Sequence, residues 1–178
     1  MIVQPETFAR AFAAAVDQFA PKIIDVWNGP LPAFTNLMLD EVLPATARRL
    51  DLQYQREYWH TDAILFTRFD SEHFGEAAGY AESVAVAVEH ENDFKLSHQE
   101  INHLSILNTP LKVLIAYPTA GERVYLDLYA RILRKADVFS DFATLRKHLV
   151  VFGYHDKGRG LAWSFFVYGE KGFSALVV

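Results

Sequence analysis

Cysteine is absent from this sequence of 178 residues, and methionine occurs only twice. A chain without cysteine has no disulfide framework, no thiolate nucleophile and no thiolate-bound zinc or iron–sulfur centre. Histidine and carboxylate side chains are then the strongest ligands that the sequence offers to a metal ion. Any metal site in this protein therefore has to be built from nitrogen and oxygen donors.

Long apolar runs are absent as well. No stretch approaches the roughly 20 residues that cross a bilayer, and Glu6 and Asp17 stand where a secretory signal has a basic start and an uninterrupted apolar segment. The 9 glycines and 7 prolines are scattered singly and do not form a linker. We therefore expect one cytoplasmic domain over residues 1–178, with no membrane segment.

The residues that are present indicate a compact fold, since 51% of them are apolar and 22% are charged. The net charge is -5, but basic residues outnumber acidic ones after residue 111. Arg131, Arg134 and Lys135 recur there at helical spacing and would suit contact with a phosphate backbone. A solvated helix face explains the same three residues without any partner.

The first half of the chain predicts helices followed by strands. Apolar residues at helical spacing predict helices over 5–20 and 33–50, with Pro21 as a boundary and Pro44 as a kink or boundary. Residues 52–68 are rich in aromatic and β-branched residues, which predicts two strands that turn near His60 and Thr61.

A strand, a helix and a second strand are predicted next. Residues 83–91, with the sequence SVAVAVEHE, are typical of a strand buried on both faces, and LKVLIAY at 111–117 is similar. Between them we expect a helix from Ser97 to about residue 108, with Ser97 and Glu100 as a capping box and Leu96 packing on Ile101. The two strands should be parallel. Residues 123–148 favour a helix, and the tail from Val150 favours an antiparallel meander.

Three acidic residues lie at the ends of the predicted strands. Glu89 and Glu91 are two residues apart, so both side chains project from one face of the strand. Asp62 lies at the edge of the apolar run in WHTDAILF. Such carboxylates suit a hard cation such as Mg²⁺ or Mn²⁺. The alternative is that the glutamates mark where a buried strand meets water and that Asp62 belongs to a turn.

In this order of elements and acids, residues 33–117 resemble the PD-(D/E)XK nuclease superfamily. Asp62 matches the metal-binding aspartate of that family, and Glu89-His90-Glu91 matches its (D/E)-x-K element on the next core strand. The resemblance implies an α/β, restriction-endonuclease-like core with a mixed central sheet flanked by helices. A helical extension over 1–32 would precede this core, and a helix with an antiparallel strand meander over 118–178 would follow it.

The resemblance also implies a reaction and its residues. An endonuclease of this family hydrolyses phosphodiester bonds in DNA or RNA. Asp62, Glu89, Glu91 and the main-chain carbonyl of His90 would hold Mg²⁺ or Mn²⁺, with the three acids catalytic. A further acid is often supplied by the preceding helix, where Glu41 is preferred over Asp40.

Glu91 departs from the family pattern, which usually has lysine at this position. Lys95, four residues on, is the alternative source of that lysine. The departure leaves two functions open, an active nuclease and a non-cleaving member of the same fold. The second would bind a protein through the apolar N-terminal helix, or nucleic acid through the basic half that holds Arg131, Arg134 and Lys135.

The seven histidines show no spacing typical of a zinc site. His98 and His103 fall on one predicted helix but are five residues apart, which places them on different faces. The sequence therefore does not favour a histidine-based zinc site.

Overall fold

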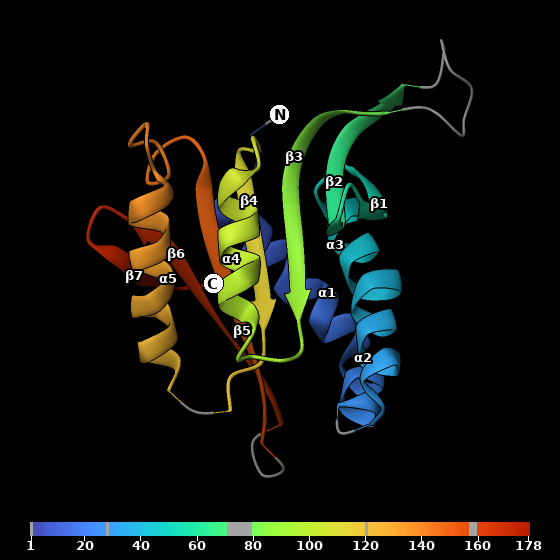
Figure 1. Cartoon of the computed structure of the whole chain (residues 1–178). Helices are drawn as coiled ribbons and strands as arrows, with labels where there is room; N and C mark the ends of the chain where they lie inside the picture. Colours follow the sequence, from blue (N-terminus) through green and yellow to red (C-terminus); the bar gives the residue numbers. More distant parts are fainter. Residues whose placement is uncertain (1, 28, 71–79, 120, 157–159) are drawn as a thin grey trace.

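The computed structural model describes residues 2–27, 29–70, 80–119, 121–156 and 160–178 (Figure 1). Its helical segments are α1 (Pro5–Val26), α2 (Leu31–Leu37), the π-helical turn η1 (Met38–Val42), α3 (Leu43–Arg49), α4 (Ser97–Ile106) and α5 (Glu122–Ala136). Its strands are β1 (Gln53–Tyr58), β2 (Thr61–Asp70), β3 (Tyr80–Glu91), β4 (Leu111–Ala116), β5 (Lys147–Asp156), β6 (Gly160–Gly169) and β7 (Gly172–Leu176). None of the helices in these ranges combines the length and the apolar character needed to cross a bilayer.

The seven strands form one mixed sheet in the order of the sequence, β1 to β7. The pairs β3–β4 and β4–β5 are parallel, and the other four pairs are antiparallel. Parallel neighbours need a crossover, which α4 and α5 supply. The expected α/β class with a mixed sheet is confirmed. The expected terminal meander is present, but β5 also pairs with β4, so the meander continues the central sheet.

Helices cover both faces of the sheet: α1 to α3 pack on one face, and α4 and α5 pack on the other (Figure 1). The alternation along β3 follows from the strand period of two, because Val86 and Val88 enter the first core whereas Ala87 enters the second. Phe8, Phe12 and Leu43 are fully buried against the first face, and Ile101, Leu104 and Tyr129 are fully buried against the second.

A two-residue turn joins β1 to β2, the strand that carries Asp62. Tyr58 pairs with Thr61, and the intervening Trp59 and His60 have positive φ angles of 49° and 63°. Two such residues are typical of the tight turns that match the twist of a hairpin. The turn predicted near His60 and Thr61 is therefore confirmed. In the separate pairing of β2 with β3, Ala63 lies opposite Val88.

Two predicted helix boundaries are wrong. Pro21 lies inside α1, which continues to Val26 because Ile23 is fully buried in the core and keeps the last turns packed. The helix predicted over 123–148 ends at Ala136, where the Asp137 carboxylate accepts hydrogen bonds from the backbone N–H groups of Asp141 and Phe142. From Lys147 the chain belongs to β5.

The predicted capping box at the start of α4 is also wrong. The Ser97 hydroxyl donates to the carbonyl of Phe94 and contacts the hydroxyl of Tyr129, so it does not cap the helix. Leu96 is 43% exposed and is not part of the buried apolar cluster that holds Ile101. Since Glu100 is not needed as a capping partner, its carboxylate is available for another role.

Lys112 of β4 is fully buried beneath the helices α4 and α5. Its ammonium group donates to the carbonyl of Thr109 at 3.0 Å and lies 5.2 Å from the ring centroid of Phe142. Burial, with a smaller contribution from the charge of Arg146, lowers the pKa of Lys112 to about 8. At neutral pH the folded protein therefore contains a buried, protonated lysine, which lowers the free energy of unfolding.

We expect Lys112→Met to increase the free energy of unfolding by about 1–2 kcal/mol at pH 7, because the buried charge is removed. The folded pKa lies below that of the unfolded lysine, so the penalty is complete below pH 8 and disappears as the pH rises to about 10.5. Urea unfolding at pH 7 and pH 10 measures the difference, with the exposed Lys171→Met as control. A loss of stability in Lys112→Met at pH 7 would contradict this account.

Candidate metal centre

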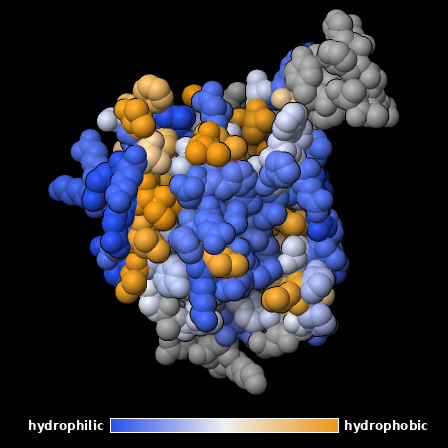
Figure 2. Space-filling view, in the orientation of Figure 1, coloured by the Kyte–Doolittle hydropathy of each residue, from blue (hydrophilic) through white to orange (hydrophobic). Residues whose placement is uncertain are grey.

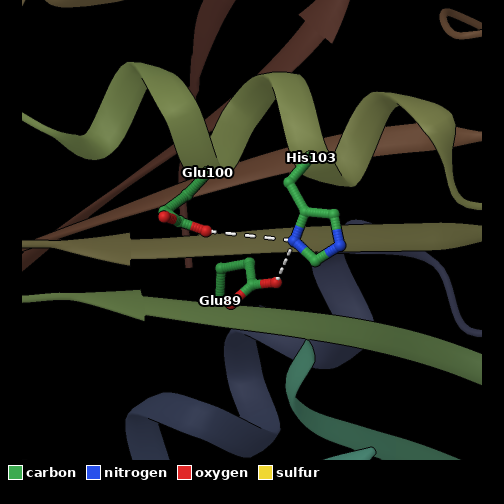
Figure 3. A group of neighbouring side chains, drawn as sticks. All are labelled: Glu89, Glu100 and His103. Carbon is green, nitrogen blue, oxygen red and sulfur yellow. Dashed lines mark ion pairs between the residues drawn. The ribbon is translucent and has the colours of Figure 1, made fainter. Parts of the chain in front are cut away.

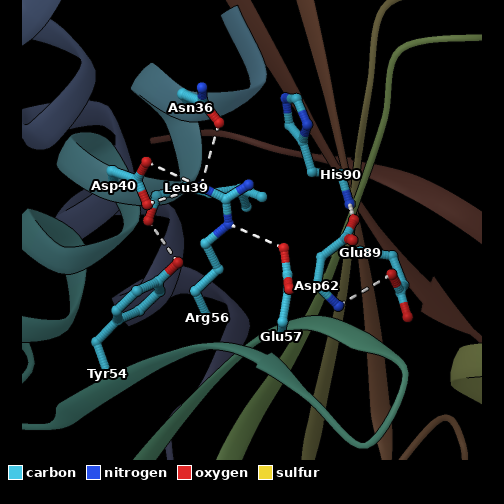
Figure 4. A network of polar contacts seen from close by, with 9 residues as sticks. All are labelled: Asn36, Leu39, Asp40, Tyr54, Arg56, Glu57, Asp62, Glu89 and His90. Carbon is cyan, nitrogen blue, oxygen red and sulfur yellow. Dashed lines mark hydrogen bonds and ion pairs between the residues drawn. The ribbon is translucent and has the colours of Figure 1, made fainter. Parts of the chain in front are cut away.

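Asp62 and Glu89 lie side by side on β2 and β3, on the face covered by α4. The Asp62 Oδ2 atom accepts a hydrogen bond of 2.8 Å from the backbone N–H of His90, and the backbone N of Asp62 lies 3.4 Å from Glu89 Oε2 (Figure 4). The last residue pair of the β2–β3 ladder is Ala63 with Val88. Beyond this pair, the backbone N–H of His90 donates to the Asp62 carboxylate and not to a backbone carbonyl of β2. This hydrogen bond holds the Asp62 carboxylate next to Glu89.

Glu91 projects from the same face of β3, two residues beyond Glu89. Its Oε1 atom accepts a hydrogen bond of 2.6 Å from the backbone N–H of Asp93. Partial burial raises the pKa of Glu91, and the negative charges of Asp93 and Asp62 raise it further. The structure therefore brings the sequence-predicted acids Asp62 and Glu89 into contact, whereas Glu91 follows on the same face of β3 with its carboxylate bonded to the Asp93 N–H.

Two side chains of α4 join this group. The helix returns along β3 in the opposite direction, so Glu100 faces the acids and His103 lies above Glu89 (Figure 3). The Nδ1 atom of His103 is 2.8 Å from Glu89 Oε1 and 4.0 Å from Glu100 Oε2. One ligand atom from each of the three residues lies within 4.8 Å of the others.

Glu89 is the most buried member of the group, with 3% of its side chain exposed. Burial raises its pKa to about 9, and the nearby charges of Asp62 and Glu100 add to the increase. Although His103 Nδ1 is close, the two atoms lack hydrogen-bond geometry, and Glu89 Oε1 receives no hydrogen bond from any described residue. A buried carboxylate oxygen without a donor is costly unless a cation occupies the space in front of it.

Like charges are concentrated at this end of the sheet. The pKa of Glu100 is also raised, by partial burial and by the charges of Glu91 and Asp62. Over the described ranges, no lysine or arginine forms an ion pair with Asp62, Glu89, Glu91 or Glu100. The four carboxylates supply the oxygen donors that Mg²⁺ and Mn²⁺ prefer, and the unpartnered oxygen of Glu89 fits such an ion.

The group can be reached from solvent on the α4 side. Glu100 and His103 have 28% and 27% of their side chains exposed. The surface over α4 is mainly hydrophilic, whereas apolar side chains gather in front of α5, on its side toward α4 (Figure 2). Glu100 and His103 therefore present polar atoms to solvent beside the buried Glu89.

The candidate acids of the preceding helical segment are not part of this group. Glu41 forms an ion pair of 2.5 Å with Lys22 of α1. Asp40 forms an ion pair of 2.8 Å with Arg56 of β1, which also donates to Asn36 and lies 3.4 Å from Glu57 (Figure 4). These contacts attach η1 to its neighbours, and the structure does not bring Glu41 to Asp62 and Glu89.

The candidate basic residues are also separate from the acids. Arg131, Arg134 and Lys135 are exposed near the C-terminal end of α5, at the opposite end of the sheet from the C-terminal end of β3 (Figure 1). Lys95 is exposed in the loop before α4, where its backbone N–H donates to Asp93. None of the four forms an ion pair with the acid group within the described ranges.

The side chain of His90 points to the other face of the sheet. Its Nε2 atom lies 2.7 Å from the hydroxyl of Tyr117, and burial lowers its pKa to about 3, so the ring is neutral. Beside this pair, at the C-terminal ends of β3 and β4, is a cavity of about 450 Å³ lined by aromatic residues that include Trp27, Phe34 and His155. The proposed ligand role of the His90 carbonyl stays a prediction.

Sequence reasoning missed Glu100 and His103. The sequence pattern predicts Glu100 as a capping partner of Ser97. His103 enters the prediction only through its spacing from His98, which does not favour a zinc site. A glutamate and a histidine three residues apart share one helical face, and this spacing occurs in carboxylate-rich metal sites. The Glu-x-x-His pattern in a helix that packs on the Glu-x-Glu strand was therefore the available signal.

No protein-family model matches this chain, and no curated protein shows significant similarity to it.

Proposed function

We propose that this protein is a metal-dependent nuclease that hydrolyses phosphodiester bonds in DNA or RNA. The observation that supports this proposal best is the contact of Asp62 with the buried Glu89 at the ends of β2 and β3, with Glu91 following on the same face of β3. The order of elements around them, from the helices before β1 to β4, agrees with the restriction-endonuclease-like core that the sequence resembles.

In this function, Asp62 and Glu89 would hold Mg²⁺ or Mn²⁺, and the hydrogen bond from the His90 N–H to Asp62 keeps the two carboxylates next to each other. The cation, when bound, supplies Lewis-acid activation of water and neutralises charge on the phosphate. Glu91 accepts the proton of the attacking water, a role that its raised pKa favours. Aromatic side chains of the cavity on the other face, such as Trp27, offer surfaces on which bases can stack.

One observation favours a second function, a non-cleaving protein that binds nucleic acid or a protein partner. Glu91 occupies the usual lysine position, and in the described ranges neither Lys95 nor another basic side chain pairs with the acids. The exposed Arg131, Arg134 and Lys135 then supply a phosphate-binding face remote from the acid group.

The experiment that tests the first function and separates it from the second is a cleavage assay. Purified protein is incubated with supercoiled plasmid, linear DNA and RNA in the presence of Mg²⁺ or Mn²⁺, with EDTA as the negative control. We expect cleavage by the wild type, a rate about 10²–10⁴-fold lower for Glu91→Gln because the proton acceptor is lost, and retained cleavage for Glu91→Lys.

Two results would reject the nuclease function of the natural chain. If Glu91→Lys cleaves and the wild type does not, the scaffold is competent and the natural protein has the binding role. If neither protein cleaves any substrate although calorimetry shows that the metal is bound, the acid group serves a purpose other than hydrolysis.

A further inference from the structure

Glu89 presents its two carboxylate oxygens to different neighbours. Its Oε2 atom lies 3.4 Å from the backbone N of Asp62, whereas Oε1 lies 2.8 Å from His103 Nδ1 on the α4 side. We propose that Glu89, Glu100 and His103 form a second cation position, distinct from the one at Asp62 and Glu91, which binds a divalent first-row transition ion through one imidazole nitrogen and two carboxylates.

The distances fit one ion with a small adjustment. Two ligands about 2.1 Å from the same ion are at most about 4.2 Å apart. The separations of 2.8 Å and 4.0 Å that His103 Nδ1 makes with Glu89 and Glu100 meet this limit. The ligand atoms of all three residues lie within 4.8 Å of one another, and the partly exposed Glu100 can adjust its distance to a shared ion by a change of side-chain rotamer.

Burial indicates that a ligand is missing at this position. Glu89 has 3% of its side chain exposed, and the oxygen that faces His103 and Glu100 receives no hydrogen bond from the described residues (Figure 3). The nearby imidazole nitrogen is not aligned to donate to it. A cation between these atoms would accept a lone pair from Glu89 Oε1 and from the His103 nitrogen, and it would neutralise the negative charge of Glu100.

The donor set determines the class of ion. Imidazole nitrogen is a good ligand for zinc, cobalt, nickel and iron, whereas Mg²⁺ and Ca²⁺ bind oxygen ligands. A position with one nitrogen and two carboxylate ligands should therefore prefer Mn²⁺, Co²⁺ or Zn²⁺ to Mg²⁺. The position at Asp62, Glu89 and Glu91 has oxygen ligands alone and lacks this preference.

This inference rests on the proposed function only through the shared residue Glu89, because binding can be measured without cleavage. Mn²⁺ and Co²⁺ are the probes. Pulsed electron paramagnetic resonance of the Mn²⁺-loaded protein detects a directly bound ¹⁴N nucleus, and titration with Co²⁺ followed by visible absorption gives the affinity in the presence of excess Mg²⁺.

We expect a ¹⁴N coupling in the wild type, its loss in His103→Asn, and Co²⁺ binding at least about tenfold weaker in both His103→Asn and Glu100→Gln. His98→Asn is the matched control, since His98 belongs to the same helix but its ring contacts the Lys95 carbonyl. Asp62→Asn should keep the ¹⁴N coupling even though it removes a ligand of the other position.

The outcomes separate the two proposals. Absence of ¹⁴N coupling in the Mn²⁺-loaded wild type, or its persistence in His103→Asn, would overturn the second position whatever the cleavage assay shows. Loss of the coupling in Asp62→Asn would also overturn it, because the ion would then occupy a single shared site. A retained coupling in a protein that fails to cleave would support the position and reject the nuclease function alone.

Discussion

Asp62→Asn and Glu89→Gln should each reduce metal-dependent cleavage by at least about 10³-fold, which corresponds to about 4 kcal/mol in the activation free energy. Both substitutions preserve the shape of the side chain and remove one negative charge from the cation position. The amide groups of the two variants would still offer a carbonyl oxygen, and the asparagine can keep the hydrogen bond from the His90 N–H, so the fold should be maintained. Single-turnover rates at saturating Mg²⁺ or Mn²⁺ measure the loss.

Glu41→Gln is the matched control for this prediction. Glu41 is an acid of the same type that the sequence predicts for the site, but it pairs with Lys22 of α1, away from Asp62 and Glu89. We expect its cleavage rate to stay within about twofold of the wild type, since an exposed ion pair contributes little to the fold. Unchanged cleavage in Asp62→Asn and Glu89→Gln, or an equal loss in Glu41→Gln, would refute the assignment of the acids.

The sequence was sufficient to predict the convergence of Asp62 and Glu89 because short-range rules determine it. The strand period of two fixes the faces of Glu89 and Glu91, and the antiparallel pairing of β2 with β3 brings Asp62, next to Ala63, to the C-terminal end of β3. The burial of β3 on both faces followed from its continuous apolar run. These features depend on residues that are close in the sequence or on adjacent strands.

The contribution of α4 could not be predicted in the same way, because it depends on how a helix rotates about its axis when it packs on the sheet. Ile101 and Leu104 are buried, and they turn Glu100 and His103 toward Glu89. The predicted capping box failed because Ser97 contacts Tyr129 of α5, a tertiary contact that local rules do not include. The C-terminal end of α5 was missed for a related reason, since the parallel pairing of β5 with β4 overrides the helical pattern near residue 147.

In the absence of metal, Glu89→Gln should increase the stability of the folded protein. The pKa of Glu89 is about 9 in the folded state, against 4.5 for the ordinary side chain. Between these two values the unfolded chain binds fewer protons than the folded protein, so the stability of the wild type falls as the pH rises. We expect the variant to exceed the wild type by about 3 kcal/mol in free energy of unfolding at pH 8, and to equal it near pH 4.

Bound metal should reverse this difference in stability, so that the wild type becomes more stable than Glu89→Gln. An ion that binds only the folded wild type stabilises it by about 2.7 kcal/mol at 100 times the dissociation constant. The glutamine side chain of the variant lacks the charge that holds the ion, so the variant should gain little. Carboxylates that are held together for metal binding should lower the stability of the metal-free protein and raise that of the metal-bound protein.

Chemical denaturation at pH 4, 6 and 8, with EDTA or with saturating Mn²⁺, measures both effects, and Glu41→Gln again serves as control because its carboxylate is partly exposed and paired with Lys22. The control should follow the pH dependence of the wild type. If Glu89→Gln were less stable than the wild type at pH 8 without metal, the buried carboxylate would have a partner within the protein. The acid group would then be a structural network, and the argument for a cation in front of Glu89 Oε1 would fail.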